Sequence, residues 1–411
     1  MSEASDILGQ PLQLPRGPAL ANRLCKSAMS EALGTPEGAP TPGLSRLYET
    51  WAEGGVGLCI TGNVMIDRRA LGEPGNVAVE DDRHMDELRA WAEAAQKGPT
   101  RAWVQINHPG KQSPKYLSPA PVAPSAVPLG PKLARYFVTP RALEPAEIED
   151  LIVRFGRTAA LVKEAGFAGV QIHGAHGYLV SQFLSPHHNR REDDWGGTAE
   201  RRMRFLLEVV AAIRAAVGED FPVGLKMNSA DFQRGGFSED ESMAVVQAVA
   251  AAGVDLVEIS GGSYEAPAMT GIRARESTLQ REAYFLDYAH KVRALVTVPL
   301  VVTGGFRSAA GMAAAVHSGA IDLVGLARPL AVEPDLPTRV LAGEDFVSLV
   351  RTLRTGIKAI DNGGLIEMTW YNRQLARMAA GEAPLPDMGA WRALLSAAVS
   401  SGRKGLSRRR A

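Results

Sequence analysis

The sequence predicts a (β/α)₈ barrel, a fold of the α/β class, from three features of the chain. Short β-branched apolar runs recur eight times, each too short for a globular helix and too apolar for an exposed antiparallel strand. Segments rich in Ala, Glu and Arg with helical spacing separate these runs. No G-x-G-x-x-G loop follows any run, which argues against an open doubly wound sheet. The repeat of strand and helix therefore indicates a parallel TIM barrel.

The bounds of the elements follow from the same pattern. We expect strands at 23–29, 57–64, 101–107, 169–174, 223–228, 256–261, 299–305 and 323–328. We expect helices at 146–166, 198–218, 239–253 and 308–319. Several of these helices end at glycine, which is a common helix stop. The strands and their helices place the barrel within residues 1–345.

Two long segments interrupt the repeat, 108–144 and 185–198. They follow the third and fourth strands, and loops in this position lie on the catalytic face of such barrels, so both are expected to wall a pocket. Residues 346–411 read as helix, loop and helix, and we treat them as a C-terminal helical extension. Its last part, 403–410, carries five basic residues in "RKGLSRRR" and is expected to be a solvated tail.

Composition excludes several classes of partner. Lys+Arg and Asp+Glu both number 45, so the formal charge is +0, and no broad electrostatic attraction to nucleic acid or an anionic membrane is expected. The two cysteines, Cys25 and Cys59, argue against a disulfide framework or a four-thiolate metal site. The first residues carry acids instead of the bases of a signal peptide, and we expect a soluble cytoplasmic protein. The expected partner is a small molecule.

The chemistry of a parallel barrel gathers where its strands end. The polar or otherwise informative residues at these ends are Met29, Ser30, Thr61, Gln105, His173, His176, Lys226, Gly304, Gly305 and Arg328. In "VTGGF" and "GLARPL", which end the seventh and eighth strands, glycines can expose backbone N–H groups to an anion, and Arg328 can clasp phosphate oxygens. We therefore predict a phosphate site formed by Gly304, Gly305 and Arg328.

His173 and His176 allow three interpretations. If the strand stops at His173 and the chain turns through Gly174, both imidazoles can aim at one point. They could bind a metal in a hydrolase, although no H-x-H or H-E-x-x-H pattern supplies the usual further ligand. They could be unrelated histidines with satisfied partners. We favour a pair of N–H donors that stabilise negative charge developing on a substrate oxygen.

Tyr178 and Lys226 have alternatives of their own. Tyr178, with an ordinary pKa near 10, could protonate a carbanion-like carbon, or its hydroxyl could simply lie in water at the rim. Lys226 lies inside the apolar strand "VGLKMN", where an unpaired ammonium is costly. Either a carboxylate such as Glu258 neutralises it, or it faces an electron-rich cofactor ring, which we favour.

These residues resemble a known family. The stretches "NRLCKSAM", "HGAHGYLVSQFLSPHHNRREDDWGG", "VGLKMN", "VTGGF" and "GLARP" are similar to motifs of the old yellow enzyme family, the FMN-dependent NAD(P)H:flavin oxidoreductases and ene-reductases. The resemblance runs from about residue 6 to 345. The family is built on an FMN-containing (β/α)₈ barrel, which agrees with the fold read from the strand pattern.

The resemblance implies a role for each motif residue. It implies that Ala28, Met29 and Ser30 lie against the flavin ring, with Thr61 nearby and Gln105 on the pyrimidine edge. It implies that Lys226 stands beside flavin N1, and that Gly304, Gly305, Ala327 and Arg328 form the phosphate site. It also implies that His173 and His176 hold the substrate's carbonyl or nitro oxygen and that Tyr178 donates a proton.

The implied reaction is a ping-pong reduction. NADH or NADPH reduces FMN and leaves, and hydride then passes to the β-carbon of an activated alkene, an α,β-unsaturated carbonyl or nitro compound, while Tyr178 protonates the α-carbon. Three residues depart from many members: Ser30 in place of Thr or Cys, Lys226 in place of Arg, and Ala327 in place of Gly. These departures leave the flavin potential and the subfamily open. The physiological alkene, the preferred nicotinamide and a homo-oligomeric state are open as well.

Three functions other than the ene-reductase remain as alternatives. The first is a metal-dependent barrel hydrolase that uses His173 and His176 as ligands. The second, within the family, is a dienoyl-CoA reductase-like or demethylating flavoenzyme, whose fused iron–sulfur architecture the two cysteines disfavour. The third is a flavin-binding subunit without turnover of its own.

Overall fold

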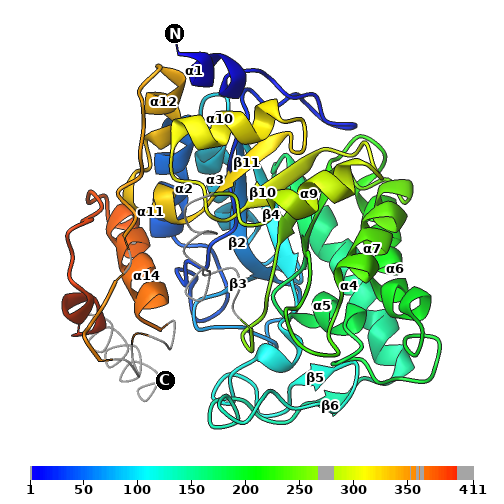
Figure 1. Ribbon diagram of the computed structural model, residues 1–411. Coiled ribbons are helices and arrows are strands. Elements are labelled where there is room, and N and C mark those ends of the chain that lie inside the picture. The colour runs from blue at the N-terminus through cyan, green and yellow to red at the C-terminus, as the bar shows by residue number, and fades with distance from the viewer. Residues whose placement is uncertain (1, 267–281, 352, 358–360, 362–364, 396–411) are drawn as a thin grey trace.

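The computed structural model describes residues 2–266, 282–351, 353–357, 361 and 365–395. Eight parallel strands form a closed ring (Figure 1), because β1 pairs with both β2 and β11. The strands of this ring are β1 (Leu24–Lys26), β2 (Leu58–Met65), β4 (Arg101–Asn107), β7 (Gly169–Gly174), β8 (Val223–Asn228), β9 (Leu256–Ser260), β10 (Leu300–Thr303) and β11 (Leu323–Leu326). The predicted (β/α)₈ barrel is confirmed.

Helices surround the ring between consecutive strands (Figure 1). The longer ones are α2 (Pro42–Glu53), α3 (Met85–Ala95), α4 (Pro145–Glu164), α6 (Ala199–Val217), α7 (Glu239–Ala251), α9 (Leu286–Arg293) and α10 (Ala309–His317). The four expected helices match α4, α6, α7 and α10 within two residues at each end. Short helices complete the chain: α1 (Glu3–Leu8), α5 (Leu179–Leu184), α11 (Arg328–Val332) and α12 (Leu336–Leu341).

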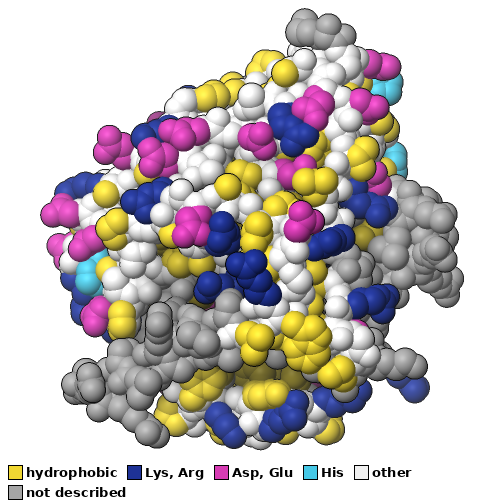
Figure 2. All heavy atoms as spheres, turned by 90° about the vertical axis from the view of Figure 1, so that its left-hand side faces the viewer, with side chains coloured by type: hydrophobic (Ala, Val, Ile, Leu, Met, Phe, Trp, Pro, Cys, Tyr) yellow, Lys and Arg dark blue, Asp and Glu magenta, His cyan; other side chains and the backbone are white. Residues whose placement is uncertain are grey.

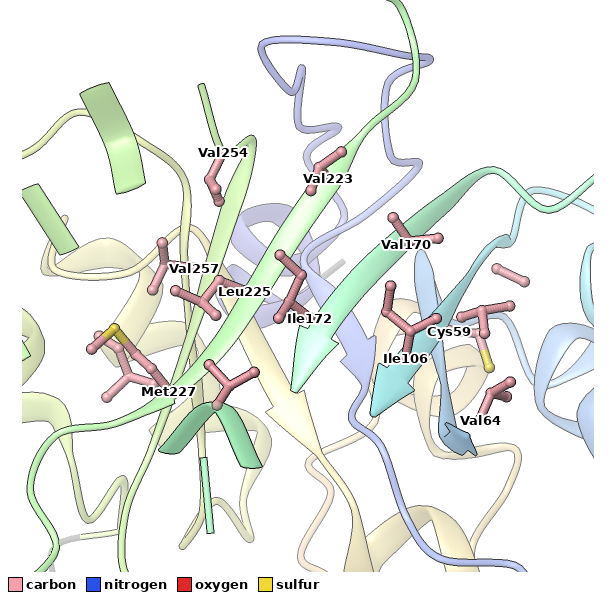
Figure 3. Close-up of a cluster of buried hydrophobic side chains, with 14 of the residues drawn as sticks. Cys59, Val64, Ile106, Val170, Ile172, Val223, Leu225, Met227, Val254 and Val257 are labelled. Carbon is pink, nitrogen blue, oxygen red and sulfur yellow. The ribbon is translucent and has the colours of Figure 1, made fainter. Parts of the chain in front are cut away.

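The main core lies between the strands and the helices. Alternate side chains of β8, Val223, Leu225 and Met227, project from one face of the strand beside Val170 and Ile172 of β7 (Figure 3). All of these side chains are fully buried. Strands that are covered in this way need apolar residues along their length, which is why the sequence shows continuous apolar runs.

A second, smaller core fills the N-terminal end of the barrel. Leu12, Leu14 and Leu20 come from a short excursion before β1, in which Leu12 and Leu20 form an antiparallel bridge. They join Trp103 and the first residues of several strands. A Cβ on Gly224 would lie 2.8 Å from the Trp103 ring, so glycine there leaves room for the indole. This smaller core fills the N-terminal end of the barrel. A catalytic site is therefore expected at the C-terminal end of the strands.

The chain after residue 345 continues into α14 (Leu365–Ala379), which lies beside α2 and α11 (Figure 1). A third cluster, which includes Ile366, Trp370 and Met388, packs α14 against the segment that follows it. Arg46 of α2 donates to the Ala379 carbonyl at 2.8 Å. The extension therefore braces the barrel, whereas the predicted basic tail 403–410 lies outside the described residues.

Basic and acidic side chains are interspersed on the side of the molecule shown in Figure 2, in keeping with the formal charge of +0. No helix in the described part of the chain has both the length and the apolar composition that a membrane crossing requires.

Candidate active site

Both long segments lie where strands end. Segment 108–144 contains a 3₁₀ turn at Gly110–Gln112 and a two-stranded sheet, β5 (Val122–Ala123) with β6 (Arg141–Ala142), which extends beyond the barrel in Figure 1. Arg191 of segment 185–198 donates to the carbonyls of Pro124 and Leu143 at 2.9 and 2.6 Å. The two segments therefore contact each other and form one wall at the C-terminal end of the barrel.

His173 and His176 converge at this end. β7 stops at Gly174, and the chain then turns so sharply that His176 adopts a φ of 61°. The Asn228 side chain holds this turn, because its Oδ1 accepts the His176 backbone N–H at 3.1 Å. His173 Nε2 and His176 Nδ1 are 3.2 Å apart, so the turn through Gly174 brings the two imidazoles to one point.

The two imidazoles belong to one chain of hydrogen bonds. His173 Nδ1 is 2.8 Å from Asn63 Oδ1, and His176 Nε2 is 2.9 Å from Ser260 Oγ. Asn63 Oδ1 can only accept, so His173 carries its proton on Nδ1. His173 Nε2 then accepts the Nδ1–H of His176. His176 Nε2 is therefore unprotonated and accepts the Ser260 hydroxyl. Burial lowers the pKa of His173 well below its ordinary value and that of His176 to about 3, so both imidazoles are neutral.

Tyr178 stands beside this pair. Its ring centroid is 4.7 Å from that of His173, and its hydroxyl is 2.9 Å from the hydroxyl of Tyr264. Burial, together with Tyr264, raises the pKa of Tyr178 well above 10, in contrast to the ordinary value expected from the sequence. The phenol is therefore a neutral donor over the whole physiological pH range.

Lys226 is paired with Glu258, its neighbour in the register of β8 and β9. The two charged atoms are 2.8 Å apart, and Glu258 also accepts from Thr303 at 2.6 Å and from Gln171 at 2.8 Å. Burial opposes the charge on Glu258, but Lys226 and these hydrogen bonds outweigh it and lower the pKa. The carboxylate partner left open by the sequence is thus present. Its presence does not prevent Lys226 from facing a cofactor.

Gln105 and Thr61 lie in the barrel interior and are fully buried. Gln105 Nε2 donates to Gln171 Oε1 at 2.7 Å, and the Gln105 backbone N–H donates to Thr61 Oγ1 at 2.9 Å. Gln171 in turn bonds Glu258, so an unbroken polar chain links Gln105 to Lys226. Ala28, Met29 and Ser30 follow β1 and are partly exposed at the same end.

The predicted phosphate residues end β10 and β11. Gly304 and Gly305 have φ angles of 125° and 95°, which favour glycine, and Ala327 precedes Arg328 at the start of α11. The Arg328 guanidinium is 3.8 Å from Glu367 of α14. The C-terminal extension therefore supplies an acidic neighbour to Arg328, which no motif in the sequence indicated.

This donor set fits a flavin mononucleotide. A guanidinium beside two glycine turns suits a phosphate, and an ammonium with buried amide and hydroxyl groups suits the polar edge of a flavin ring. Both lie at the C-terminal end of the barrel, where His173 is the register partner of Lys226 across β7 and β8.

Several site residues were not predicted. Asn63, Asn228 and Ser260 lie within expected strands or at their ends, so the rule that selected the other polar residues could have found them. Tyr264 lies in the loop after β9, and only the tertiary structure places its hydroxyl against Tyr178.

A metal site at the histidine pair gains no support. Among the described residues, one group of three His, Cys, Asp or Glu side chains is close enough to hold an ion, and it consists of His187, His188 and Glu265. His173 and His176 hydrogen-bond each other and two uncharged side chains instead.

Barrels of this fold carry many different chemistries at their C-terminal end, so the family is taken from comparison with known proteins. Residues 8–345 match the model of the NADH:flavin oxidoreductase / NADH oxidase family. The chain belongs to this family, which confirms the resemblance to old yellow enzyme and rules out the hydrolase alternative.

Individual relatives agree. The chain is 39% identical over 388 residues to the NADH-dependent flavin oxidoreductase iliE of Hypocrea jecorina, covering 89% of this chain and 94% of the relative. Morphinone reductase, solved in complex with tetrahydroNAD, has a TM-score of 0.69 at 26% identity, with 84% of this chain and 92% of that one covered.

A third comparison is with a longer protein. The 2-naphthoyl-CoA reductase, solved with 2-naphthoyl-CoA, has a TM-score of 0.77 at 27% identity. The match covers 84% of this chain and 54% of that one, so this chain spans about half the length of that reductase.

Proposed function

We propose that the protein is an FMN-dependent ene-reductase that uses NADH or NADPH to reduce the activated C=C bond of α,β-unsaturated carbonyl or nitro compounds. Membership of the NADH:flavin oxidoreductase family supports the flavin and the nicotinamide. The observation that carries the proposal is the convergence of His173, His176 and Tyr178 beside Lys226.

In this proposal the residues at the barrel end hold FMN in two parts. Its phosphate would be bound by Gly304, Gly305, Ala327 and Arg328. The polar edge of its ring would be bound by Lys226, Gln105 and Thr61. The ring would be contacted by Ala28, Met29 and Ser30. Bound FMN supplies hydride transfer from NADH or NADPH to the alkene. The Lys226 ammonium would be the positive charge at that edge and would favour negative charge there.

The imidazole pair orients the substrate oxygen. In the structure His173 Nε2 accepts from His176, so a proton must move from His173 Nδ1 to Nε2 before His173 can donate to a substrate. Rotation of the Asn63 amide by about 180° permits this, because Asn63 Nδ2 then donates to Nδ1. His176 Nδ1–H becomes available in the same step. Two neutral donors would then stabilise the charge that builds on the substrate oxygen.

Tyr178 completes the reaction by protonating the α-carbon. Its hydroxyl proton is retained at rest because burial raises the pKa, and it is lost only to a strongly basic carbon.

The test begins with the cofactor. Purified protein should be yellow and should release FMN on denaturation. A colourless preparation that cannot be reconstituted with FMN would contradict the proposal.

Variants then test the residues. Replacing both His173 and His176 with Ala should abolish the charge-transfer band that phenols give with the bound flavin. Tyr178→Phe should slow reoxidation by 2-cyclohexenone by ~10²–10⁴ and leave reduction by NADH unchanged. Equal effects of Tyr178→Phe on both half-reactions would remove it as the proton donor.

Steady-state kinetics with NADH and NADPH should then be measured against enones, maleimides, nitroalkenes and an unsaturated acyl-CoA. The last substrate is included because of the structural likeness to 2-naphthoyl-CoA reductase. A preference for the acyl-CoA would select the dienoyl-CoA reductase-like alternative within the family. Oxidation of NADH without reduction of any of these substrates would favour a simple oxidase, and a flavin-loaded protein that does not oxidise NADH would favour the flavin-binding subunit.

A further inference from the structure

We infer that Tyr264 is the group that replaces the proton Tyr178 gives up, so that the two phenols form a relay from solvent to the substrate carbon. This inference rests on the proposed function, because it assumes that Tyr178 is the donor. No motif in the sequence points to Tyr264, and its role follows from its position in the structure.

The hydroxyls of Tyr178 and Tyr264 are in contact, and the two residues differ in their exposure to solvent. Tyr178 is 7% exposed, and its hydroxyl lies 2.9 Å from that of Tyr264. The Tyr264 side chain is reached by solvent, with 37% of its surface exposed. The rings meet edge to face, with centroids 6.0 Å apart. Of the two bonded phenols, Tyr264 is therefore the one with surface exposed to solvent.

The loop that carries Tyr264 is anchored on both sides. Ser263 forms a parallel bridge with His176, and its hydroxyl oxygen accepts the backbone N–H groups of Glu265 and Ala266 at 3.2 and 3.3 Å. Glu265 Oε1 accepts the backbone N–H of Gly130 at 2.8 Å. Tyr264 is thus fixed relative to the imidazole pair and to segment 108–144.

Glu265 has a second neighbour. Its Oε2 is 3.8 Å from His188 Nε2, and His188 Nδ1 is 2.8 Å from the buried ammonium of Lys111. Three loops at the catalytic end therefore meet at the residue that follows Tyr264. These contacts hold the Tyr264 backbone in place and so keep the distance between the two phenols short.

Two other neighbours of Tyr178, Asn63 and His173, cannot supply a proton. The Asn63 amide, which also hydrogen-bonds the Tyr178 hydroxyl, is not an acid. His173 is neutral because burial lowers its pKa well below the ordinary value, so it holds no spare proton. Tyr264 does hold one. Burial of the larger part of the residue raises its pKa to about 12, so its hydroxyl is protonated at rest, as is that of Tyr178, whose pKa is also raised.

The transfer balances as follows. Hydride forms the C–H bond at the β-carbon, and the electron pair of the C=C π bond moves toward the α-carbon. This pair forms a C–H bond at the α-carbon with the Tyr178 proton as the Tyr178 O–H bond breaks. As negative charge grows on the Tyr178 oxygen, the Tyr264 O–H bond breaks and its proton passes to Tyr178. Tyr264 then takes a proton from water. Both phenols end neutral, and one solvent proton has entered the product.

The test compares Tyr264→Phe with Tyr136→Phe, a control that removes a half-exposed hydroxyl from segment 108–144. We expect Tyr264→Phe to slow reoxidation of the reduced enzyme by 2-cyclohexenone about tenfold or more, short of the ~10²–10⁴ expected for a direct donor. Reduction by NADH and reoxidation by ferricyanide, which needs no protonation of carbon, should not change. Tyr136→Phe should match the wild type throughout.

A proton inventory in mixtures of H₂O and D₂O gives a readout that a structural role would not move. The wild type should give a curved plot of the enone step, because two protons move together, and Tyr264→Phe should give a straight line. A straight line for the wild type would overturn the relay even if the variant failed to fold.

The two hypotheses fail in different ways. If Tyr178→Phe slows the enone step and Tyr264→Phe changes it less than twofold, the relay is wrong and the proposed donor stands. If Tyr178→Phe has no effect on that step, both are wrong.

Discussion

Lys226 and Glu258 carry opposite charges inside a barrel whose other interior residues are mostly apolar. Each is almost completely buried, and Glu258 also accepts hydrogen bonds from Gln171 and Thr303. Removing one member of a buried pair leaves an uncompensated charge, which is far more costly than losing an exposed pair.

Glu258→Gln should therefore lower the free energy of unfolding by about 3–5 kcal/mol. The matched control is Glu239→Gln, because Glu239 pairs with Lys291 at 2.7 Å while both side chains are largely exposed. That change should cost about 0–1 kcal/mol. Urea denaturation of the three proteins measures the difference. Equal losses would mean that the interior pair is screened by water.

The sequence identified most of the polar residues at the barrel end because strand position alone selects them. It also named Glu258 among the explanations for Lys226. It could not identify Tyr264 or Glu367, because one lies in a loop and the other in the C-terminal extension. Their contacts with Tyr178 and Arg328 depend on how distant segments pack, and a local pattern carries no such information.

At the scale of elements, the turn after β10 determines where the predicted phosphate site lies. Gly305 has a φ of 95°, and a Cβ there would lie 2.8 Å from both the Ala283 nitrogen and the Tyr284 ring. Gly319, after α10, has a φ of 73° but nothing within 4 Å of its Cβ position. An alanine at Gly319 would therefore meet only an unfavourable backbone angle, whereas an alanine at Gly305 would also collide with neighbouring atoms.

Gly319→Ala should cost about 1–2 kcal/mol, because only the left-handed backbone is strained. Gly305→Ala should cost about 1–3 kcal/mol more, since the neighbouring backbone and ring must also move. Thermal unfolding of the holoprotein, converted to free energies, measures both. A smaller loss for Gly305→Ala would show that the segment carrying Ala283 and Tyr284 shifts freely.

Element bounds were predicted well where amphipathic or buried runs are long, as in α4 and α6. The expected first strand, 23–29, was too long, since the described ladder ends at Lys26. Beyond Lys26 the Ser27 backbone N–H still donates to the Leu326 carbonyl of β11 at 2.8 Å, and Ala28 and Met29 then leave the ladder and are partly exposed. The stretch "WYNRQLAR" (370–377) resembles the endings of some relatives and suggested that the extension braces the barrel or reaches a partner subunit. Its contact with α2 could not be located from the sequence, because Arg46 and Ala379 are far apart in the chain.

At the scale of the whole molecule, buried neutral histidines make stability depend on pH. Burial lowers the pKa of His108 to about 4 and that of His176 to about 3. The unfolded chain, with histidine pKa values near 6.5, binds more protons than the folded chain below that pH. The stability is therefore fully present above about pH 6.5 and falls as the pH drops toward the folded pKa.

His176→Gln tests this dependence. Each such histidine contributes a slope of up to about 1.4 kcal/mol per pH unit. Between pH 6 and pH 4 the free energy of unfolding of His176→Gln should fall less steeply than that of the wild type by about this amount. Urea denaturation at several pH values measures the slopes. Parallel slopes would mean that His176 is protonated in the folded protein.

The ring of strands is closed by its first and last members, with Leu24 of β1 opposite Val324 of β11. During synthesis the ribosome delivers β1 early and β11 only after most of the chain has emerged. Until then two strand edges stay unpaired, and Leu12, Leu14 and Leu20 lack part of the apolar surface that covers them. Completion of the fold must therefore follow translation of the last strand, and in the interval the nascent chain is exposed to aggregation and is a natural client for chaperones.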